Sequence, residues 1–355
     1  MHPRLFTPVP LSPLPWKISY GSELLFLGSC FAESIGNRFA ERKFKTLINP
    51  FGILYNPASL ATALRRMVEN RPYRESDLFV SDSLYHSLDH HGSFSGSDKQ
   101  EVLTRINQKL SVAHDTLARA SYLFITPGTA RVYRHRESGR IAGNCHKLPS
   151  GHFDTECLST EESYSLLSDA LDGVLALNSR IKLIFTLSPV RYIKNGAHQS
   201  QIEKATLLLA LNRLSDRYRE QSFYFPAYEI MLDELRDYRF YAEDMVHPSE
   251  TAISYLFEKV EEVMTDEESS ALSRQILSVV AASRHRLLHP TANAVASFAQ
   301  KQLDNIASLT PHCTRFGVSL AEEERYFRTL LPLPGQSAPD CVASRHNRSE
   351  PQGFL

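Results

Sequence analysis

The sequence lacks the features that mark several special classes of protein. Only five of its 355 residues are cysteines, and no two of them form a CxxC pair. Closely spaced cysteines are the usual sign of a zinc site or a disulfide framework, so reduced thiols are expected instead. No stretch reaches the roughly 18 apolar residues that a membrane span requires. We therefore expect neither a structural metal nor a membrane span.

An excess of charge of one sign is also missing. Lys and Arg number 39 against 40 Asp and Glu, which gives a formal net charge of −1. Without a positive field, nucleic acid is not an expected partner. The first twenty residues carry five prolines and no continuous apolar core, so they do not resemble a signal peptide. A cytoplasmic location is expected, with export by another route left open.

What is present is a regular alternation of apolar runs and helical patterns. Five short runs fit strands buried on both faces of a parallel sheet: Glu23–Leu27, Phe44–Ile48, Ser121–Thr126, Ile181–Leu187 and Ser222–Ala227. The helical patterns lie at Ala32–Arg42, Ser59–Glu69, Glu161–Leu177, Gln199–Glu220 and Ile253–Met264. This alternation predicts a doubly wound α/β fold with a mostly parallel sheet.

Other stretches fall outside that alternation. Phe79–Lys99 and Arg131–Asp154 are rich in polar residues and glycine, and they are predicted as long loops. A helical appendage is expected over residues 267–310. Pro, Ser, Gly and charged residues dominate residues 311–355, which predicts a mostly irregular tail. The expected organisation is thus a domain over 1–266, the appendage and the tail.

The first chemical feature is a serine placed directly after a strand. Gly28 and Ser29 follow the apolar run, and a helical pattern begins next. Ligands of α/β sheets bind at such strand ends, where free helix amides favour negative charge. Ser29 is therefore a candidate nucleophile, with a plain helix cap as the alternative. Cys30 is a rival nucleophile, since a helix start favours a thiolate, although it could also pack as a small apolar residue.

The second chemical feature is an acid–base pair near the end of the α/β region. Asp244 and His247 are three residues apart, and Pro248 and Ser249 begin the last helical pattern. The proline favours an extended His247, turned outward before the helix starts. His247 could take the proton of Ser29 while Asp244 orients the imidazole. The alternative is a helix entry in which Asp244 caps and His247 lies on the surface.

Together these features resemble a known superfamily, the SGNH/GDSL hydrolases, and within it the GSCFA family. The resemblance covers roughly residues 20–265. It is carried by GSCFAESIG (Gly28–Gly36), INPFGILYNP (Ile48–Pro57), ITPGTARVYR (Ile125–Arg134), NCHK (Asn144–Lys147), TLSPVRY (Thr186–Tyr192) and DYRFYAEDMVHPS (Asp237–Ser249). It implies a three-layer, flavodoxin-like sandwich. It also implies a catalytic triad of Ser29 as nucleophile, Asp244 as acid and His247 as base.

The resemblance further implies an oxyanion hole, which departs here from the superfamily pattern. The amides of Ser29 and Gly52 match two of its three donors. The third is the asparagine of a GxND block, but PGTA stands at that place and has none. The Thr129 hydroxyl or the Asn144 amide could replace it. Loss of one such donor typically costs about 10²–10³ in rate.

Several loop residues are candidates for substrate binding. His90, His91 and His146 lie in the two predicted loops, and their spacing fixes no metal geometry. Arg131 and Arg191 follow strands on the side of Ser29 and could bind an anionic group bidentately. A solvated loop or an ion pair with Asp237 is the alternative.

These residues predict a serine esterase that removes a short, acetyl-like group from a small-molecule or glycan ester, without a cofactor. An acyltransferase on the same triad is the first alternative, acting on a glycan or a cell-envelope precursor. The basic segment Arg131–Arg140 could hold its phosphorylated donor, such as CoA. The second alternative is a non-catalytic binding protein that keeps the fold. The oligomeric state is left open.

Overall fold

A five-stranded parallel sheet forms the centre of the chain. The computed structural model describes residues 7–285 and 291–331. The strands are β1 (Glu23–Gly28), β2 (Lys45–Ile48), β5 (Tyr122–Thr126), β9 (Lys182–Phe185) and β10 (Ser222–Tyr224). They lie in the order β10-β9-β5-β1-β2, and each neighbouring pair is parallel. The predicted α/β fold with a mostly parallel sheet is confirmed.

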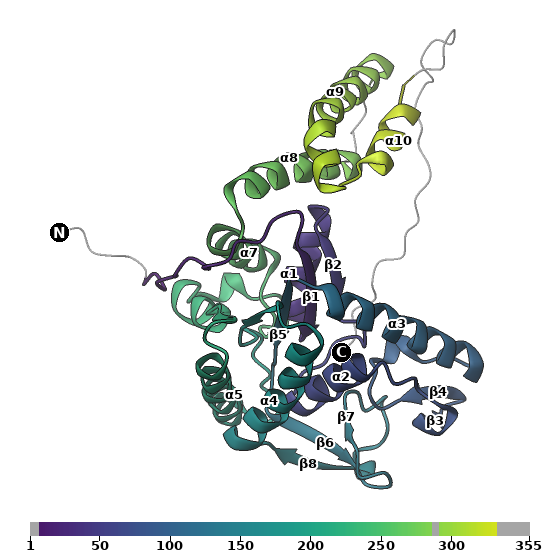
Figure 1. Cartoon of the computed structure of the whole chain (residues 1–355), viewed down its shortest axis with the longest axis vertical. Coiled ribbons are helices and arrows are strands. Elements are labelled where there is room, and N and C mark those ends of the chain that lie inside the picture. Colours follow the sequence, from purple (N-terminus) through teal and green to yellow (C-terminus); the bar gives the residue numbers. More distant parts are fainter. Residues whose placement is uncertain (1–6, 286–290, 332–355) are drawn as a thin grey trace, which may run out of the picture. The chain divides into compact units, whose positions relative to one another are not determined.

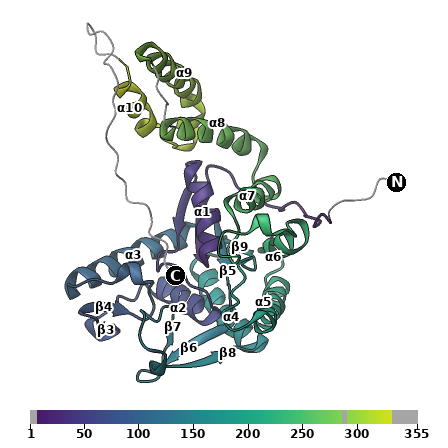
Figure 2. The ribbon, with the colours of Figure 1, turned by 180° about the vertical axis from the view of Figure 1, so that it is seen from behind.

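Helices cover both faces of this sheet because successive strand residues point to opposite sides. On one face lie α1 (Cys30–Glu41) and α7 (Glu250–Met264). There Phe26 of β1 stacks on Phe124 of β5 with ring centroids 4.3 Å apart. Phe39 of α1 meets Phe257 of α7 edge-on at 5.0 Å. Figure 2 is seen from the side of these two helices.

The opposite face carries four helices and the largest cluster of buried side chains. They are α2 (Pro57–Glu69), α3 (Lys99–Arg119), α4 (Thr160–Leu177) and α5 (Ala197–Arg217). Leu25 and Leu27 of β1 belong to this cluster, together with leucines of all four helices. Both faces of β1 are therefore apolar, as its continuous hydrophobic run indicates. Figure 1 shows α4 in front of the sheet.

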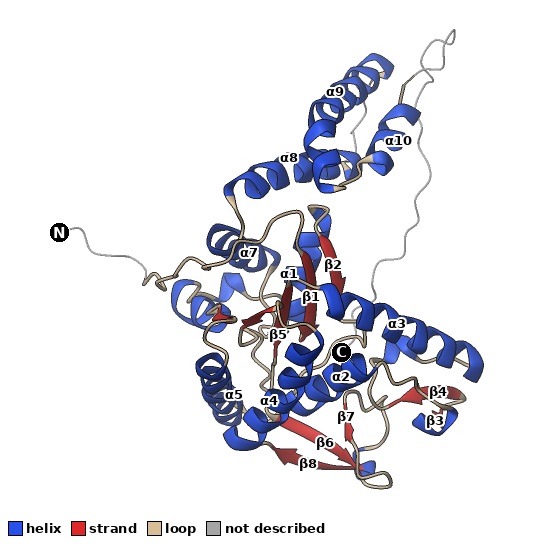
Figure 3. Cartoon of the chain, viewed as in Figure 1, coloured by secondary structure: helices blue, strands red, loops and turns tan. Residues whose placement is uncertain are grey.

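The two predicted loops contain regular structure, and the structure differs from the prediction here. Phe79–Lys99 holds most of a hairpin of β3 (Leu78–Ser81) and β4 (Leu84–Ser87). Its turn residues Asp82 and Ser83 both have positive φ, as the tight turns of hairpins require. Arg131–Asp154 holds β6 (Arg131–His135), β7 (Ile141–Ala142) and the start of β8 (Phe153–Cys157). These three form a second sheet in the order β7-β6-β8 (Figure 3).

The chain divides after Ser270 into two compact units. The helices beyond the sheet are the short α6 (Ala227–Glu229), and then α8 (Glu267–Arg284), α9 (Ala292–Phe316) and α10 (Ala321–Thr329). The predicted irregular tail differs over residues 311–329, because α9 continues through Pro311 and α10 follows. The rest of that tail, residues 332–355, lies outside the described residues. Among the helices described, none is long and apolar enough to cross a membrane.

Candidate active site

A tight turn ends β1 and begins α1. Gly28 has a φ of 152°, and a Cβ added there would lie 2.3 Å from the carbonyl oxygen of Thr126. Its amide donates to Asn49 Oδ1 at 2.9 Å, and its carbonyl accepts from the Leu54 amide at 3.0 Å. The turn therefore admits only glycine, and it brings the ends of β1, β2 and β5 together.

Ser29, the predicted nucleophile, is buried inside this turn, with only 1% of its surface exposed. It occupies the N-cap position of α1, but its side chain makes no cap hydrogen bond. Its Oγ is buried and has no hydrogen-bond partner among the described residues. Its amide, predicted as an oxyanion donor, already donates to the Thr126 carbonyl at 3.0 Å.

Cys30, the first residue of α1, is half-buried. A hydrogen bond with the Cys30 side chain is the largest of the causes that raise the pKa of His247 to about 9. Burial opposes this shift, and the hydrogen bond with Asp244 adds to it. Cys30 is thus among the causes that set the pKa of His247, whereas Ser29 is not.

Asp244 and His247 form the predicted pair. Asp244 Oδ2 lies 2.6 Å from His247 Nδ1, and both side chains are 49% exposed. Asp244 Oδ1 accepts the amides of Val246 and His247, each at 2.9 Å. Burial alone would raise the pKa of Asp244, but these hydrogen bonds outweigh it and lower that pKa to about 2. Asp244 therefore fixes both the imidazole and the backbone that carries it.

Neighbouring segments hold this loop in place. The Ala242 amide donates to the His247 carbonyl at 2.8 Å, which closes the loop on itself. The Arg191 amide donates to the Val246 carbonyl at 3.1 Å and ties the loop to the segment after β9. Ser249 then caps α7 by accepting the Ala252 amide. His247 is thus carried on a braced loop.

The segment after β5 passes directly beside the turn at Gly28 and Ser29. The Tyr55 carbonyl accepts the amides of Gly128 and Thr129 at 2.7 and 3.1 Å. A Cβ added to Gly128 would lie 3.6 Å from both Ser29 Cβ and Tyr55 Cδ1, and 3.8 Å from Ser188 Cβ. Burial and the nearby Cys30 raise the pKa of Tyr55 to about 12. Side chains from three strand ends therefore surround Gly128, where the strand order reverses between β1 and β5.

A comparison with known protein families matches the part of the chain that contains this site. A sequence model of the GSCFA family matches residues 23–260, which include the whole central sheet, Cys30 and His247. The chain belongs to the GSCFA family. No curated protein matches it. In this GSCFA chain, the peptide that gives the family its name is the turn from β1 into α1.

The other oxyanion candidates of the GSCFA chain have partners of their own. The Gly52 amide donates to the Asn49 carbonyl at 2.7 Å. The Thr129 hydroxyl donates to Glu203. Asn144 Oδ1 accepts the His146 amide at 2.8 Å, within the second predicted loop. The structure therefore does not bring these three groups together at Cys30 as available donors.

The first backbone amides of α1 form a different set of hydrogen-bond donors at Cys30. The first helical hydrogen bond of α1 runs from the Glu33 amide to the Ser29 carbonyl at 3.3 Å. The amides of Cys30, Phe31 and Ala32 precede it, and the first amides of a helix have no partner within the helix. The helix dipole adds a partial positive charge there. In the sequence, the pattern of a strand, a turn and a helix indicates these free amides.

The three loop histidines lie in a separate part of the GSCFA chain. His90 is 1% exposed and stacks on Phe51, and burial is the largest cause that lowers its pKa to about 3. His146 is also buried, which lowers its pKa to about 4, and its Nε2 lies 2.8 Å from the Ser87 carbonyl. His91 packs against Gly52 and accepts the Ser93 amide. No three His, Cys, Asp or Glu side chains in the described ranges could hold a metal ion.

The two candidate arginines differ in their surroundings. Arg131 pairs with Glu203 at 2.7 Å, and the side chain of Glu203 is only 4% exposed. Its guanidinium is therefore engaged within the protein rather than presented to a ligand. Arg191 is half-buried, and its backbone braces the His247 loop as described above.

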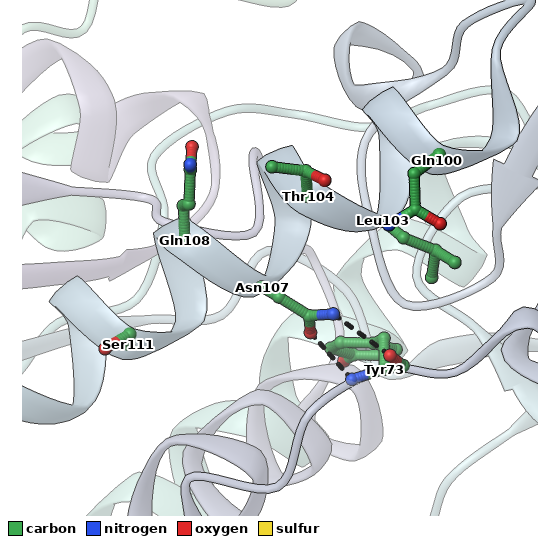
Figure 4. Close-up of a pocket in the computed structure, with 7 residues that line it drawn as sticks. All are labelled: Tyr73, Gln100, Leu103, Thr104, Asn107, Gln108 and Ser111. Carbon is green, nitrogen blue, oxygen red and sulfur yellow. Dashed lines mark hydrogen bonds between the residues drawn. The ribbon is translucent and has the colours of Figure 1, made fainter.

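A shallow hollow of about 500 Å³ on α3 is not part of this site. Tyr73 and six residues of α3 line it, as Figure 4 shows, and none of them is a candidate site residue. Its Asn107 side chain already bonds both the amide and the carbonyl of Tyr73.

Proposed function

We propose that this protein is an acyl-ester hydrolase of the SGNH type that uses Cys30 as its nucleophile. The observation that carries the proposal is the Asp244–His247 pair, with Oδ2 2.6 Å from Nδ1, and the Cys30 side chain supports it as the largest cause that raises the pKa of His247. Nucleophile, base and orienting acid within hydrogen-bond reach of one another are the mark of covalent catalysis. The strand order, which is that of flavodoxin-like sandwiches, adds support.

The protonation of His247 favours the thiol over the hydroxyl. The raised pKa of His247 favours the protonated imidazole, which is a poorer acceptor for the proton of a serine. The side chain that interacts with this imidazole is that of Cys30, and cysteine is intrinsically the stronger nucleophile. The Oγ of Ser29 is also buried, whereas Cys30 is half-buried. Ser29 is therefore the weaker candidate, although the sequence favours it.

The proposed reaction has two steps. The Cys30 thiolate attacks the ester carbonyl, a C–S bond forms, and the first amides of α1 stabilise the oxyanion. As the C–O bond breaks, His247 gives its proton to the leaving alkoxide and an acyl thioester remains. The neutral imidazole then takes a proton from water, which attacks the thioester and releases the acid and the thiolate. We keep the expectation of a short, acetyl-like acyl group on a small-molecule or glycan alcohol.

Transfer to another alcohol by way of a phosphorylated donor is less well supported. The guanidinium groups expected to hold such a donor are paired with Glu203, Glu156, Asp154 and Asp89. These arginines are Arg131, Arg134, Arg136 and Arg140.

Hydrolysis of p-nitrophenyl acetate by the wild type and by single variants tests the proposal. We expect Cys30→Ala and His247→Ala to lose at least about 10²-fold in kcat/KM, the scale of acid–base catalysis. Ser29→Ala should keep activity within about tenfold, because the Ser29 Oγ makes no hydrogen bond and the backbone amide is retained in alanine. Cys157→Ala is the matched control, since it removes an exposed cysteine of β8.

Three outcomes would overturn the proposal. Equal rates for the wild type and Cys30→Ala would exclude Cys30 as nucleophile. Loss of activity in Ser29→Ala alone would return that role to the hydroxyl. No turnover of any ester, with a saturable stabilisation by acetyl-CoA, would favour a transferase.

A further inference from the structure

Two buried histidines form hydrogen bonds with the same serine at the end of β4. His90 is 1% exposed, and its Nδ1 lies 2.9 Å from the Ser87 hydroxyl. His146 is 9% exposed, and its Nε2 lies 2.8 Å from the Ser87 carbonyl oxygen. Ser87 thus joins two segments that are far apart in the sequence, the one after β4 and the turn that follows β7.

Aromatic rings surround both imidazoles. The His146 ring lies 5.6 Å from the ring of Phe79 and 4.6 Å from that of His86. Three rings have their centres 4.8 to 5.0 Å from that of His90, and they belong to Phe51, Tyr73 and Phe94. A positive charge in such surroundings loses its hydration, which is costly. Both histidines are therefore stable here in the neutral form.

The hydrogen bonds of His146 also require the neutral form. Because its Nε2 faces a carbonyl oxygen, this nitrogen carries the hydrogen and donates it. Its Nδ1 is buried and has no hydrogen-bond partner among the described residues. A proton added to Nδ1 would create a buried donor without an acceptor at hydrogen-bond distance, and such a group is destabilising.

The carboxylates in this region are already paired with arginines. Asp89 is 6% exposed, accepts the Tyr73 hydroxyl at 3.0 Å and pairs with Arg140 at 2.7 Å. Asp77 pairs with Arg66 of α2 at 3.3 Å. Neither carboxylate therefore offers a free partner to an imidazolium.

Burial is the largest cause that lowers the pKa of both imidazoles, and positive charge on neighbouring groups adds to it. For His90 these groups are Arg66, Arg140 and His146, and for His146 they are His86 and His91. The carbonyls of Ser87 and His90 oppose the shift of His146 only in part. From α3, Arg105 donates to the carbonyls of Phe94 and Ser95 at 2.8 and 3.2 Å.

The two histidines also belong to the structure that supports the turn at Gly28. The His90 ring stacks on that of Phe51, and the His91 amide donates to the Phe51 carbonyl at 2.9 Å. Leu54, three residues further on, donates its amide to the Gly28 carbonyl at 3.0 Å. Release of the segment after β4 would therefore uncover Phe51 and loosen the support of this turn.

We propose that His90 and His146 form an acid-sensitive switch, which holds segments 87–94 and 144–147 together at neutral pH and releases them in mild acid while the central sheet stays folded. Each imidazole takes up a proton from solvent when its segment opens, because the open segment lets water hydrate the charge. His146 and Lys147 have φ of 49° and 59°, a left-handed conformation that is costly for both, so the turn relaxes once its contacts are lost. This inference does not rest on the proposed function.

Three variants remove the titration and keep most of the packing. His90→Phe keeps an aromatic ring on Phe51 and cannot take up a proton. His146→Gln keeps a donor for the Ser87 carbonyl and carries no charge. The third variant combines both changes. His198→Gln is the matched control, because this histidine is exposed near the start of α5.

The readout is hydrogen exchange of the backbone amides in the two segments at pH 7 and pH 5, corrected for intrinsic exchange rates. An imidazole that ionises near its ordinary pKa of about 6.5 only in the open state favours opening about 25-fold more at pH 5 than at pH 7. Protection in the wild type should therefore fall about 600-fold, and in each single variant about 25-fold. The double variant should change little, and His198→Gln should match the wild type.

Equal protection of the wild type at the two pH values would overturn the inference, as would a double variant that loses as much protection as the wild type. An equal loss of protection in β1 and β5 at pH 5 would reveal global unfolding instead of a switch. If the double variant does not fold, the single variants still decide, because each should lose clearly less protection than the wild type. The measurement involves no ester turnover, so its result is independent of the proposed function.

Discussion

The titration of His247 offers a direct test of the site geometry. Its pKa is raised from an ordinary 6.5 to about 9, with the contact to Cys30 as the largest cause and the bond to Asp244 as a smaller one. Cys30→Ala and Asp244→Asn remove these two contacts separately. The imidazole can be followed in each variant by the NMR signals of its ring protons.

The exposure of the pair sets the expected size of the Asp244 effect. Both side chains are 49% exposed, and exposed ion pairs contribute only about 0.2–1 kcal/mol. Since one pKa unit corresponds to about 1.4 kcal/mol, Asp244→Asn should lower the pKa of His247 by less than about one unit. Cys30→Ala should lower it by more than Asp244→Asn does. A larger shift in Asp244→Asn, or none in Cys30→Ala, would refute the contact between sulfur and imidazole.

The same contacts make stability depend on pH. The pKa of His247 is higher in the folded chain, so its contribution is complete below 6.5 and is lost as pH rises through about 9. The pKa of Asp244 is lower in the folded chain, so its contribution is present above 3.8 and is lost as pH falls through about 2. Given the exposure of both groups, each contribution should not exceed about 1 kcal/mol. Urea unfolding of the wild type and Cys30→Ala should therefore diverge at neutral pH and converge in strongly alkaline solution.

Further substitutions test the turn and a buried ion pair. Gly28→Ala should prevent stable folding, because its Cβ would meet the Thr126 carbonyl at 2.3 Å, and circular dichroism would reveal the loss. Gly128→Ala makes only ordinary contacts of 3.6 Å or more, so it should fold normally, and its methyl group should lower ester turnover by occupying space beside Ser29. Asp89 is 6% exposed and pairs with Arg140 at 2.7 Å, so Asp89→Ala should lower the free energy of unfolding by about 3 kcal/mol in urea titrations. A folded Gly28→Ala, an active Gly128→Ala or an unchanged midpoint for Asp89→Ala would contradict the respective argument.

The central sheet was predictable because its strands are apolar on both faces. In β1, Leu25 and Leu27 face α2 to α5, and Phe26 faces α1 and α7. A continuous apolar run of this kind is typical of a strand covered by helices on both sides. β5 and β9 share this property, whereas the edge strands β2 and β10 are only partly buried.

The long helix α3 was not predicted, although its sequence has a cap and an apolar face, because polar segments surround it. Asp98 caps it by accepting the Glu101 amide, and Val102, Ile106 and Leu110 follow on one buried face. The second sheet had a weaker signal. In β6 and β8, charged residues pair across the strands, so no single strand shows an apolar alternation. Such pairing depends on a partner strand that local sequence does not reveal.

At the candidate site, too, the sequence predicted contacts within one loop but not contacts between distant segments. The spacing of Asp244 and His247 predicted their pairing, because both lie in one loop. Which of Ser29 and Cys30 meets His247 depends on the direction of side chains at the start of α1. Successive helical side chains differ by about 100° in direction, so neighbours cannot both face one partner.

The closed geometry of the His247 loop also has a consequence for folding. Every bond that pairs Asp244 with His247 spans three residues or fewer, and the Ala242 amide closes the same loop. Contacts of such low sequence separation form quickly and need little of the remaining chain. Cys30, in contrast, reaches the imidazole only after the whole sheet between them is assembled. A chain that is still folding would therefore carry the Asp244–His247 pair before Cys30 is in place, and any effect of Cys30 on the imidazole would appear last, as a marker of completed folding.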